Sequence, residues 1–102
     1  MLLAEARDQV VGAVEVRENR HISLLFVEGR LQRRGIARSL LKAAVGICLM
    51  AAPGVRELTV NASPNAVLAY ERLGFTPAGP EQTVNGIRFI PMALALPVAQ
   101  AA

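Results

Sequence analysis

The sequence predicts an α/β fold: an α+β sandwich on a mixed, mostly antiparallel sheet, with the element order β-β-β-α-β-α-β-β. Three strand-like runs come first and are joined by turns of a few residues, which is typical of an antiparallel meander. A helical pattern then leads to a fourth strand-like run, which indicates a parallel crossover. Near the end, Asn85-Gly86 is a strong signal for a hairpin turn, because both residues tolerate positive φ.

The first three strands are expected over residues 2–5, 10–17 and 21–27. Turn residues separate them, at Arg7-Asp8-Gln9 and at Glu18-Asn19-Arg20. The second run, VVGAVEVR, is rich in β-branched residues, which favour strands. The third, HISLLFV, is so apolar that we expect it to be buried on both faces.

A long helix is expected over residues 32–50, followed by a break at Pro53-Gly54 and a fourth strand over residues 58–61. Apolar side chains recur at helical spacing and form its buried stripe: Ile36, Leu40, Leu41, Ala44, Val45 and Cys48. Because Cys48 lies on this stripe, we interpret it as a core residue.

The second helix is bounded by three residues with distinct roles. Ser63 is a suitable N-cap, Pro64 occupies the first helical position, and Gly74 closes the far end. One face carries Ala66, Ala69, Tyr70 and Leu73.

The last part of the chain predicts a hairpin. Phe75 leads into it, and the returning strand covers residues 87–96. Pro91 within that strand removes a ladder donor, so we expect a bulge or a sheet edge there. All these elements form a single domain over residues 1–96, and residues 97–102 form a flexible tail.

Composition excludes several classes of protein. The 102 residues suffice for one core, and 53% are hydrophobic, which excludes a disordered chain. The net charge of +3 comes almost entirely from arginine, a skew that often reflects genome composition. We do not expect nucleic-acid binding, because no exposed aromatic series alternates with the cations.

The chain has one cysteine and one histidine, His21, too few for a disulfide framework or a metal cluster, so no metal is expected. No apolar run is long enough to span a bilayer, and the first residues do not resemble a signal peptide. We therefore expect a cytoplasmic protein without membrane contact. His21 is interpreted as a structural residue at a strand end, with a general base as the alternative.

Residues 27–41, VEGRLQRRGIARSLL, carry the chemistry. A strand ends there, and a helix begins whose first N–H groups are unpaired and attract phosphate. Gly35 and Ala37 are small, so a pyrophosphate could approach the backbone. Arg30, Arg34 and Arg38 are spaced by four, and they either contact phosphate oxygens or form a solvated helix face.

Two motifs carry a resemblance to a known family. Residues 32–37 read Q-x-x-G-x-A and resemble the acetyl-CoA pyrophosphate loop of the GCN5-related N-acetyltransferase (GNAT) family. Residues 65–75, NAVLAYERLGF, resemble that family's A-x-x-x-Y-E-K-x-G-F helix, and residues 79–92 resemble the last hairpin of many small bacterial members.

The resemblance covers residues 10–96 and implies a shortened member of the family. The strand and two helices with which a full GNAT domain begins have no counterpart in this sequence. We therefore expect a GNAT-like acyl-CoA fold with an exposed apolar sheet face. A homodimer or a partner chain is expected to cover that face.

The resemblance also implies an N-acetyltransferase that moves an acetyl group from acetyl-CoA to a primary amine by direct attack. In that mechanism Tyr70 is the general acid that protonates the CoA thiolate; a core tyrosine with a bonded hydroxyl is the alternative. A backbone N–H near Phe26 or Val27 polarises the thioester carbonyl. The pyrophosphate and its flanks are bound by Gln32, Arg33, Arg34, Gly35, Ile36, Ala37 and Arg38.

Two further points follow from the resemblance. Ser63 occupies the position where the family has an asparagine, so Asn61 or Asn65 is expected to contact pantetheine instead. The alternative function is a catalytically incomplete acyl-CoA-binding module that needs a dimer mate or partner chain. The sequence singles out neither the acceptor amine nor a general base.

Overall fold

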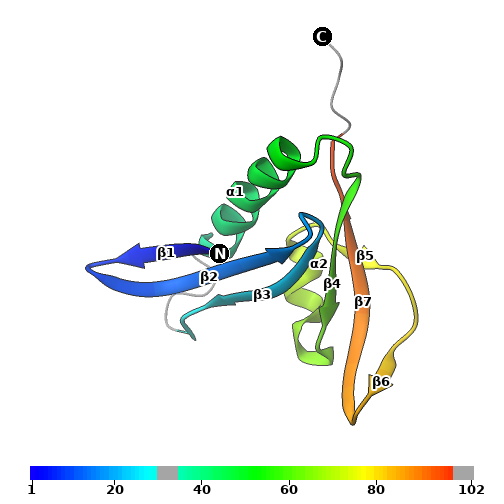
Figure 1. The fold of residues 1–102 in the computed structure, drawn as a ribbon. Coiled ribbons are helices and arrows are strands. Elements are labelled where there is room, and N and C mark those ends of the chain that lie inside the picture. The colour runs from blue at the N-terminus through cyan, green and yellow to red at the C-terminus, as the bar shows by residue number, and fades with distance from the viewer. Residues whose placement is uncertain (30–34, 98–102) are drawn as a thin grey trace.

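The computed structural model describes residues 1–29 and 35–97, which form one sheet and two helices (Figure 1). The sheet has two wings, one of β1, β2 and β3 and the other of β4, β5, β6 and β7. The strand order is β1-β2-β3-β4-β7-β5, and β6 pairs with β7. The strands are β1 (Leu2–Ala6), β2 (Gln9–Arg17), β3 (His21–Val27), β4 (Glu57–Ala62), β5 (Thr76–Pro77), β6 (Gln82–Val84) and β7 (Ile87–Ala95). The helices are α1 (Ile36–Ala51), the 3₁₀ turn η2 (Pro64–Ala66) and α2 (Val67–Arg72).

The predicted order is confirmed, with one refinement before the last hairpin. The segment between Phe75 and the Asn85-Gly86 turn forms two short strands, β5 and β6, where the sequence predicted one. Asn85 and Gly86 have φ values of 51° and 79°, as the predicted turn requires. The part of the predicted first helix before Gly35 lies outside the described residues.

The wing formed by β1, β2 and β3 is an antiparallel meander with two tight turns, as predicted. Arg7 and Asp8 have φ values of 51° and 64°, and Glu18 and Asn19 have values of 54° and 57°. Two successive positive φ values match the right-handed twist of the flanking strands. The second of these turns places His21 at the start of β3.

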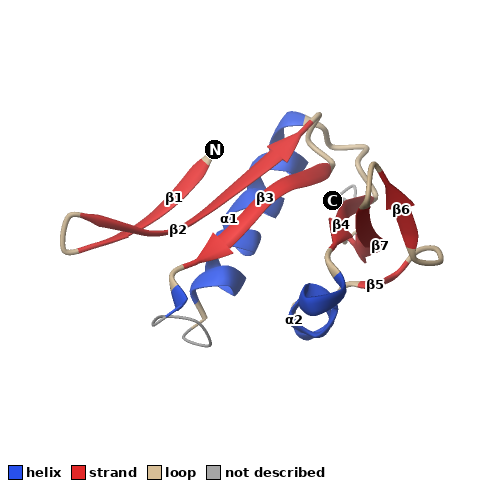
Figure 2. Ribbon diagram, turned by 90° about the horizontal axis from the view of Figure 1, so that it is seen from below, coloured by secondary structure: helices blue, strands red, loops and turns tan. Residues whose placement is uncertain are grey.

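β3 and β4 form a fork. They pair in parallel only at His21–Thr59 and at Ile22–Val60, and β3 then turns away from β4 (Figure 2). The radius of gyration is 14.1 Å, larger than the value of about 13 Å for a compact chain of this length. The opening between β3 and β4 separates the two wings, and α2 lies beside it.

The core lies between the sheet and α1. The predicted helix stripe is confirmed, because Leu40, Leu41, Ala44 and Cys48 are buried in one cluster with core residues of the sheet. Burial also raises the pKa of the Cys48 thiol. α1 lies close to the sheet at Gly12, where an added Cβ would be 3.0 Å from the Phe26 carbonyl oxygen and 3.1 Å from Leu40 Cδ1.

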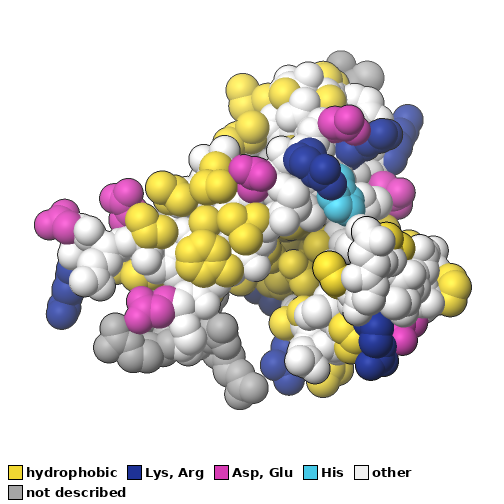
Figure 3. All heavy atoms as spheres, turned by 60° about the horizontal axis from the view of Figure 1, so that its bottom comes forward, with side chains coloured by type: hydrophobic (Ala, Val, Ile, Leu, Met, Phe, Trp, Pro, Cys, Tyr) yellow, Lys and Arg dark blue, Asp and Glu magenta, His cyan; other side chains and the backbone are white. Residues whose placement is uncertain are grey.

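The prediction that the third strand is buried on both faces is wrong. Within β3 only Ile22 is buried, while Leu24 is 38% exposed and Phe26 is 44% exposed. α1 covers only one face of this wing, and β4 no longer borders β3 beyond Ile22. Figure 3 shows hydrophobic side chains gathered over this wing.

Two local predictions also need correction. Asn61 pairs with Pro91 without a shift in register, so of the two predicted alternatives, a bulge or an edge, the bulge is absent. The Pro91 carbonyl accepts a hydrogen bond from Ala78 N at 2.7 Å, so it points toward the segment between β5 and β6. The nitrogen of Pro91 points to the same side of β7, where its missing N–H interrupts no strand ladder, as at a sheet edge. Ser63 is the N-cap residue of η2, but its side chain forms no capping bond there.

None of the helices in the described ranges combines the length and apolar character needed to cross a membrane.

Candidate functional site

An open hollow of about 810 Å³ lies in the fork, between the end of β3, the start of α1 and the short helix α2. Its lining brings together most of the predicted site residues that the structure describes: Phe26, Val27, Gly35, Ala37, Arg38, Asn65 and Tyr70. The volume is in the range of small-molecule and cofactor sites. The exception on α1 is Ile36, which packs against the core.

The start of α1 offers backbone donors to this hollow. Gly35 has a φ of 78°, and a Cβ built on it meets nothing within 4 Å, so a ligand can approach the backbone there. The first intrahelical bond runs from Ser39 N to the Gly35 carbonyl. The preceding N–H groups of the first turn therefore have no intrahelical acceptor. The predictions for Gln32, Arg33 and Arg34 lie outside the described residues.

Arg38 connects the two helices that border the hollow. Its Nη2 donates a hydrogen bond of 2.8 Å to the Arg72 carbonyl at the end of α2. Carbonyls at a helix end carry partial negative charge, which favours a guanidinium there. Because the guanidinium has five N–H donors, this contact leaves others for a ligand.

Tyr70 lies in the fork with its ring partly buried. The ring packs edge-to-face against Phe75, with centroids 5.3 Å apart and planes at 77°. Burial raises the pKa of Tyr70 above its usual value of 10.0, so the phenol is protonated at neutral pH. No side chain or carbonyl of the described residues forms a hydrogen bond with its hydroxyl.

The two candidate asparagines lie in different places. Asn65 lines the fork hollow beside Tyr70, whereas Asn61 lines a separate hollow on the other side of the strand pair. The position of Asn65 favours it over Asn61 for a contact with a ligand in the fork.

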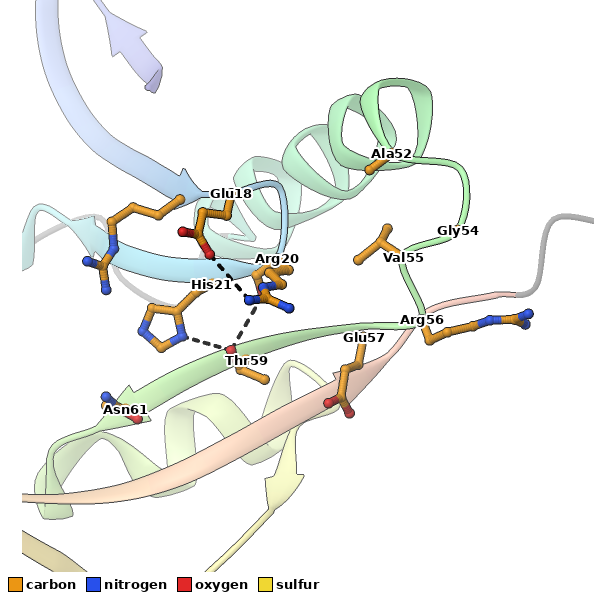
Figure 4. Close-up of a pocket in the computed structure, with 11 residues that line it drawn as sticks. Glu18, Arg20, His21, Ala52, Gly54, Val55, Arg56, Glu57, Thr59 and Asn61 are labelled. Carbon is orange, nitrogen blue, oxygen red and sulfur yellow. Dashed lines mark hydrogen bonds and ion pairs between the residues drawn. The ribbon is translucent and has the colours of Figure 1, made fainter.

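The second hollow, of about 1070 Å³, was missed by sequence reasoning (Figure 4). It is bordered by the turn between β2 and β3, by the loop after α1 and by β4. The β4 residues that line it alternate with the buried Leu58 and Val60, so it opens on the face opposite α1. Residues 17–21 come to lie beside residues 52–61 only because α1 connects β3 to the parallel strand β4. No local sequence motif predicts that contact.

His21 and Thr59 form the central polar pair of the second hollow. Nδ1 of His21 lies 2.7 Å from Thr59 Oγ1, and Thr59 Oγ1 in turn donates to the Arg20 carbonyl at 3.5 Å. Charged side chains surround the pair, including Arg17 and Glu18. In the described part of the chain, no three His, Cys, Asp or Glu side chains are grouped so as to hold a metal ion.

Comparison with known proteins gives a consistent result. The family model described as an acetyltransferase (GNAT) domain matches residues 1–96. A GCN5-related N-acetyltransferase from Rhodopseudomonas palustris is 25% identical with a TM-score of 0.77, and an IAA acetyltransferase from Bacillus cereus is 26% identical with a TM-score of 0.66. The chain aligns over 92% of its own length with each, and spans 59% of the first and 75% of the second.

An aminoglycoside 6'-N-acetyltransferase solved in complex with coenzyme A has the same fold, at 15% identity and a TM-score of 0.72. The alignment covers 93% of this chain and 72% of that one. No significant match is found among curated proteins. The similarity to solved structures therefore concerns a core that is shorter than several of its relatives.

Proposed function

Because the chain belongs to the acetyltransferase (GNAT) domain family, we propose that it transfers an acetyl group from acetyl-CoA to a primary amine. The observation that carries this proposal is the fork hollow. It gathers a strand edge, an unpaired helix start and a protonated tyrosine around one space of suitable volume. Each of these three features supplies one requirement of acyl transfer.

Each part of the fork hollow has a separate role in the proposed reaction. The backbone N–H groups at the start of α1 bind the pyrophosphate, with Arg38 beside them. A backbone N–H of β3 near Phe26 or Val27 polarises the thioester carbonyl, and Asn65 holds the pantetheine amide. Tyr70 donates its proton to the sulfur as the amine displaces it directly. The acetyl group that acetyl-CoA supplies passes to the amine without a covalent enzyme intermediate.

Substitution of Gly35 tests the phosphate cradle. Asn and Asp have nearly the same shape and both tolerate a positive φ, so Gly35→Asn and Gly35→Asp impose a similar backbone strain. We expect Gly35→Asp to bind acetyl-CoA at least tenfold more weakly than Gly35→Asn, because its carboxylate repels phosphate. Calorimetric titration measures both affinities. Equal affinities of the two variants would contradict binding of the pyrophosphate at this helix start.

A second candidate function is favoured by the open face of the β1–β3 wing. Leu3, Leu24 and Phe26 are between 38% and 50% exposed on the face opposite α1. Such a surface is typical of an interaction site. The chain is then an acyl-CoA-binding module, and a second copy or a partner chain covers the wing.

The second candidate predicts self-association through that face. We expect the purified chain to sediment as a dimer, and Leu24→Ser with Phe26→Ser to shift it to a monomer with the same circular dichroism. Ile47→Ser with Met50→Ser, on the exposed side of α1, is the matched control and should remain dimeric. If the parent is a monomer at all concentrations, the predicted dimer is contradicted. A different partner chain would then be the remaining occupant of this face.

A further inference from the structure

We propose that Arg38 is a positioning residue that couples phosphate binding at the start of α1 to the placement of Tyr70 on α2. This inference deepens the proposed acetyl transfer and rests on it. The phosphate cradle and the proton donor belong to different helices, so the transfer requires these helices to keep a fixed relation while acetyl-CoA is bound. Arg38 connects the two helices by a hydrogen bond.

The bond from Arg38 reaches the helical turn that carries Tyr70. Nη2 of Arg38 donates to the Arg72 carbonyl over 2.8 Å. The Tyr70 carbonyl accepts from the N–H groups of Leu73 and Phe75, each at 3.0 Å, so the backbone from Tyr70 to Arg72 belongs to one closed turn. A guanidinium at this helix end also meets the partial negative charge of the last carbonyls. Arg38 therefore holds the backbone from which the Tyr70 side chain extends.

Few other contacts hold α2 in place. It has six residues, none of them buried, and among them only Val67 and Tyr70 pack partly against the core. Within the described part of the chain, no second side-chain hydrogen bond or ion pair joins α2 to another element. A segment with so few buried contacts has a low local stability. One charged hydrogen bond at its end therefore has a measurable effect on its orientation.

The other donors of Arg38 are available to the phosphate cradle. Arg38 follows Gly35 and Ala37 in the first turn of α1 and lines the same hollow. A guanidinium has five N–H donors in one plane, and the bond to the Arg72 carbonyl occupies one nitrogen. The remaining donors suit a phosphate oxygen. None of the described residues that line this hollow is acidic, so no carboxylate among them competes with phosphate for the guanidinium.

A coupling residue and a simple phosphate ligand have different kinetic effects. Proton transfer from Tyr70 to the sulfur requires the two atoms to lie within hydrogen-bond reach. If α2 moves more freely, it spends less time in that geometry, and the rate at saturating acetyl-CoA falls. A residue that only bound phosphate would change the affinity and leave kcat unchanged. The coupling therefore predicts a loss in both quantities when Arg38 is replaced.

The first arm of the test observes Tyr70 without turnover. Because the chain has one tyrosine, its ring resonances are assigned without ambiguity in an NMR spectrum of tyrosine-labelled protein. The probe is adenosine diphosphate, which has a pyrophosphate but no pantetheine arm to lie beside Tyr70. We expect saturation with this probe to shift the Tyr70 resonances in the parent and in Arg72→Gln, which keeps the accepting carbonyl. The shift should be absent in saturated Arg38→Met.

Each other outcome of this arm has a defined meaning. A shift of parental size in Arg38→Met, or no shift in the saturated parent, overturns coupling through Arg38. If adenosine diphosphate does not bind the parent at all, the phosphate cradle is contradicted, and the proposed function with it. Arg38 is exposed, so all variants should keep the circular dichroism of the parent.

The second arm measures CoA release at saturating acetyl-CoA, with a panel of a diamine, an amino-acid amide and an aminoglycoside. We expect Arg38→Met to lower kcat about tenfold through misplacement of Tyr70, and to weaken acetyl-CoA binding about tenfold through loss of the phosphate contact. Arg38→Lys keeps the charge without the planar fork, so it should recover more of the affinity than of kcat. A weaker affinity at the parental kcat would make Arg38 a phosphate ligand only and overturn the inference, with acetyl transfer intact.

A double-mutant cycle with Tyr70→Phe decides whether Arg38 acts through Tyr70. In the Tyr70→Phe background no phenol remains to be positioned, so Arg38→Met should lower the affinity but cause no further loss of kcat. An equal loss of kcat in both backgrounds overturns the inference. If the parent binds acetyl-CoA but releases no CoA with any amine, the proposed transfer is contradicted and this role of Arg38 with it.

Discussion

Tyr70→Phe is expected to lower the rate of acetyl transfer by about 100-fold to 1000-fold while acetyl-CoA binds with its original affinity. The substitution removes one oxygen and keeps the ring that packs edge-to-face against Phe75. A change in rate without a change in binding separates an enzyme from a module that only binds acyl-CoA. CoA release measures the rate, and calorimetry measures the affinity.

The pH dependence of the parent gives an independent check on Tyr70. Burial raises the pKa of its phenol above 10.0, so the acid form persists through neutral pH and is lost only as pH rises above that value. Any loss of rate between pH 7 and pH 9 must then come from another group. Tyr70→Phe should therefore leave the profile between pH 6 and pH 9 unchanged in shape.

Arg72→Gln is a suitable control for this comparison. Its side chain also lines the fork hollow, but its carbonyl, which accepts the bond from Arg38, is retained in the variant. We expect a much smaller change in rate than for Tyr70→Phe. Equal rates in Tyr70→Phe and the parent would assign Tyr70 the alternative role of a core tyrosine.

Most of the fold could be predicted because local signals agree with the long-range arrangement. The helical stripe from Ile36 to Cys48 and the Asn85-Gly86 turn each depend on a few neighbouring residues, and both are confirmed. The apolar run of the third strand led to a wrong prediction of burial on both faces. A run of hydrophobic residues does not reveal whether a second layer covers the strand. Leu24 and Phe26 are exposed since no described element packs on that face.

Of the two hollows, one could be predicted from local sequence motifs and the other could not. The fork hollow could be anticipated, because Gly35 and Tyr70 belong to local motifs that precede and follow the fourth strand. The far hollow could not, since it depends on the pairing of His21 with Thr59, 38 residues apart in the chain. Sequence alone placed His21 at a strand end but gave no sign of its partner. The two hollows are related only through the point at which β3 and β4 separate.

Phe75→Ala is expected to cost about 3–5 kcal/mol in the free energy of unfolding. Phe75 is 1% exposed and is the largest fully buried side chain among the described residues. Its loss leaves a cavity between the sheet and the helices that the close-packed surroundings fill only in part. Urea unfolding followed by circular dichroism measures the change, and the m-value shows whether unfolding remains two-state.

Phe26→Ala is the matched control, because it deletes the same atoms from a position that is 44% exposed. We expect a loss of less than about 1 kcal/mol there, since surface substitutions leave no cavity. If both variants lose the same stability, the core does not centre on Phe75.

The expected loss at Phe75 also bears on the site. Domains of this size are stable by only about 5–15 kcal/mol, so Phe75→Ala lies near the limit of folding at 37 °C. At 15 °C, where the variant remains folded, Tyr70 has lost the ring that fixes its orientation. Transfer should then fall, whereas Phe75→Leu, which fills most of the cavity, should keep more of both stability and rate. A folded Phe75→Ala with the full rate would show that the orientation of Tyr70 depends on other contacts of α2.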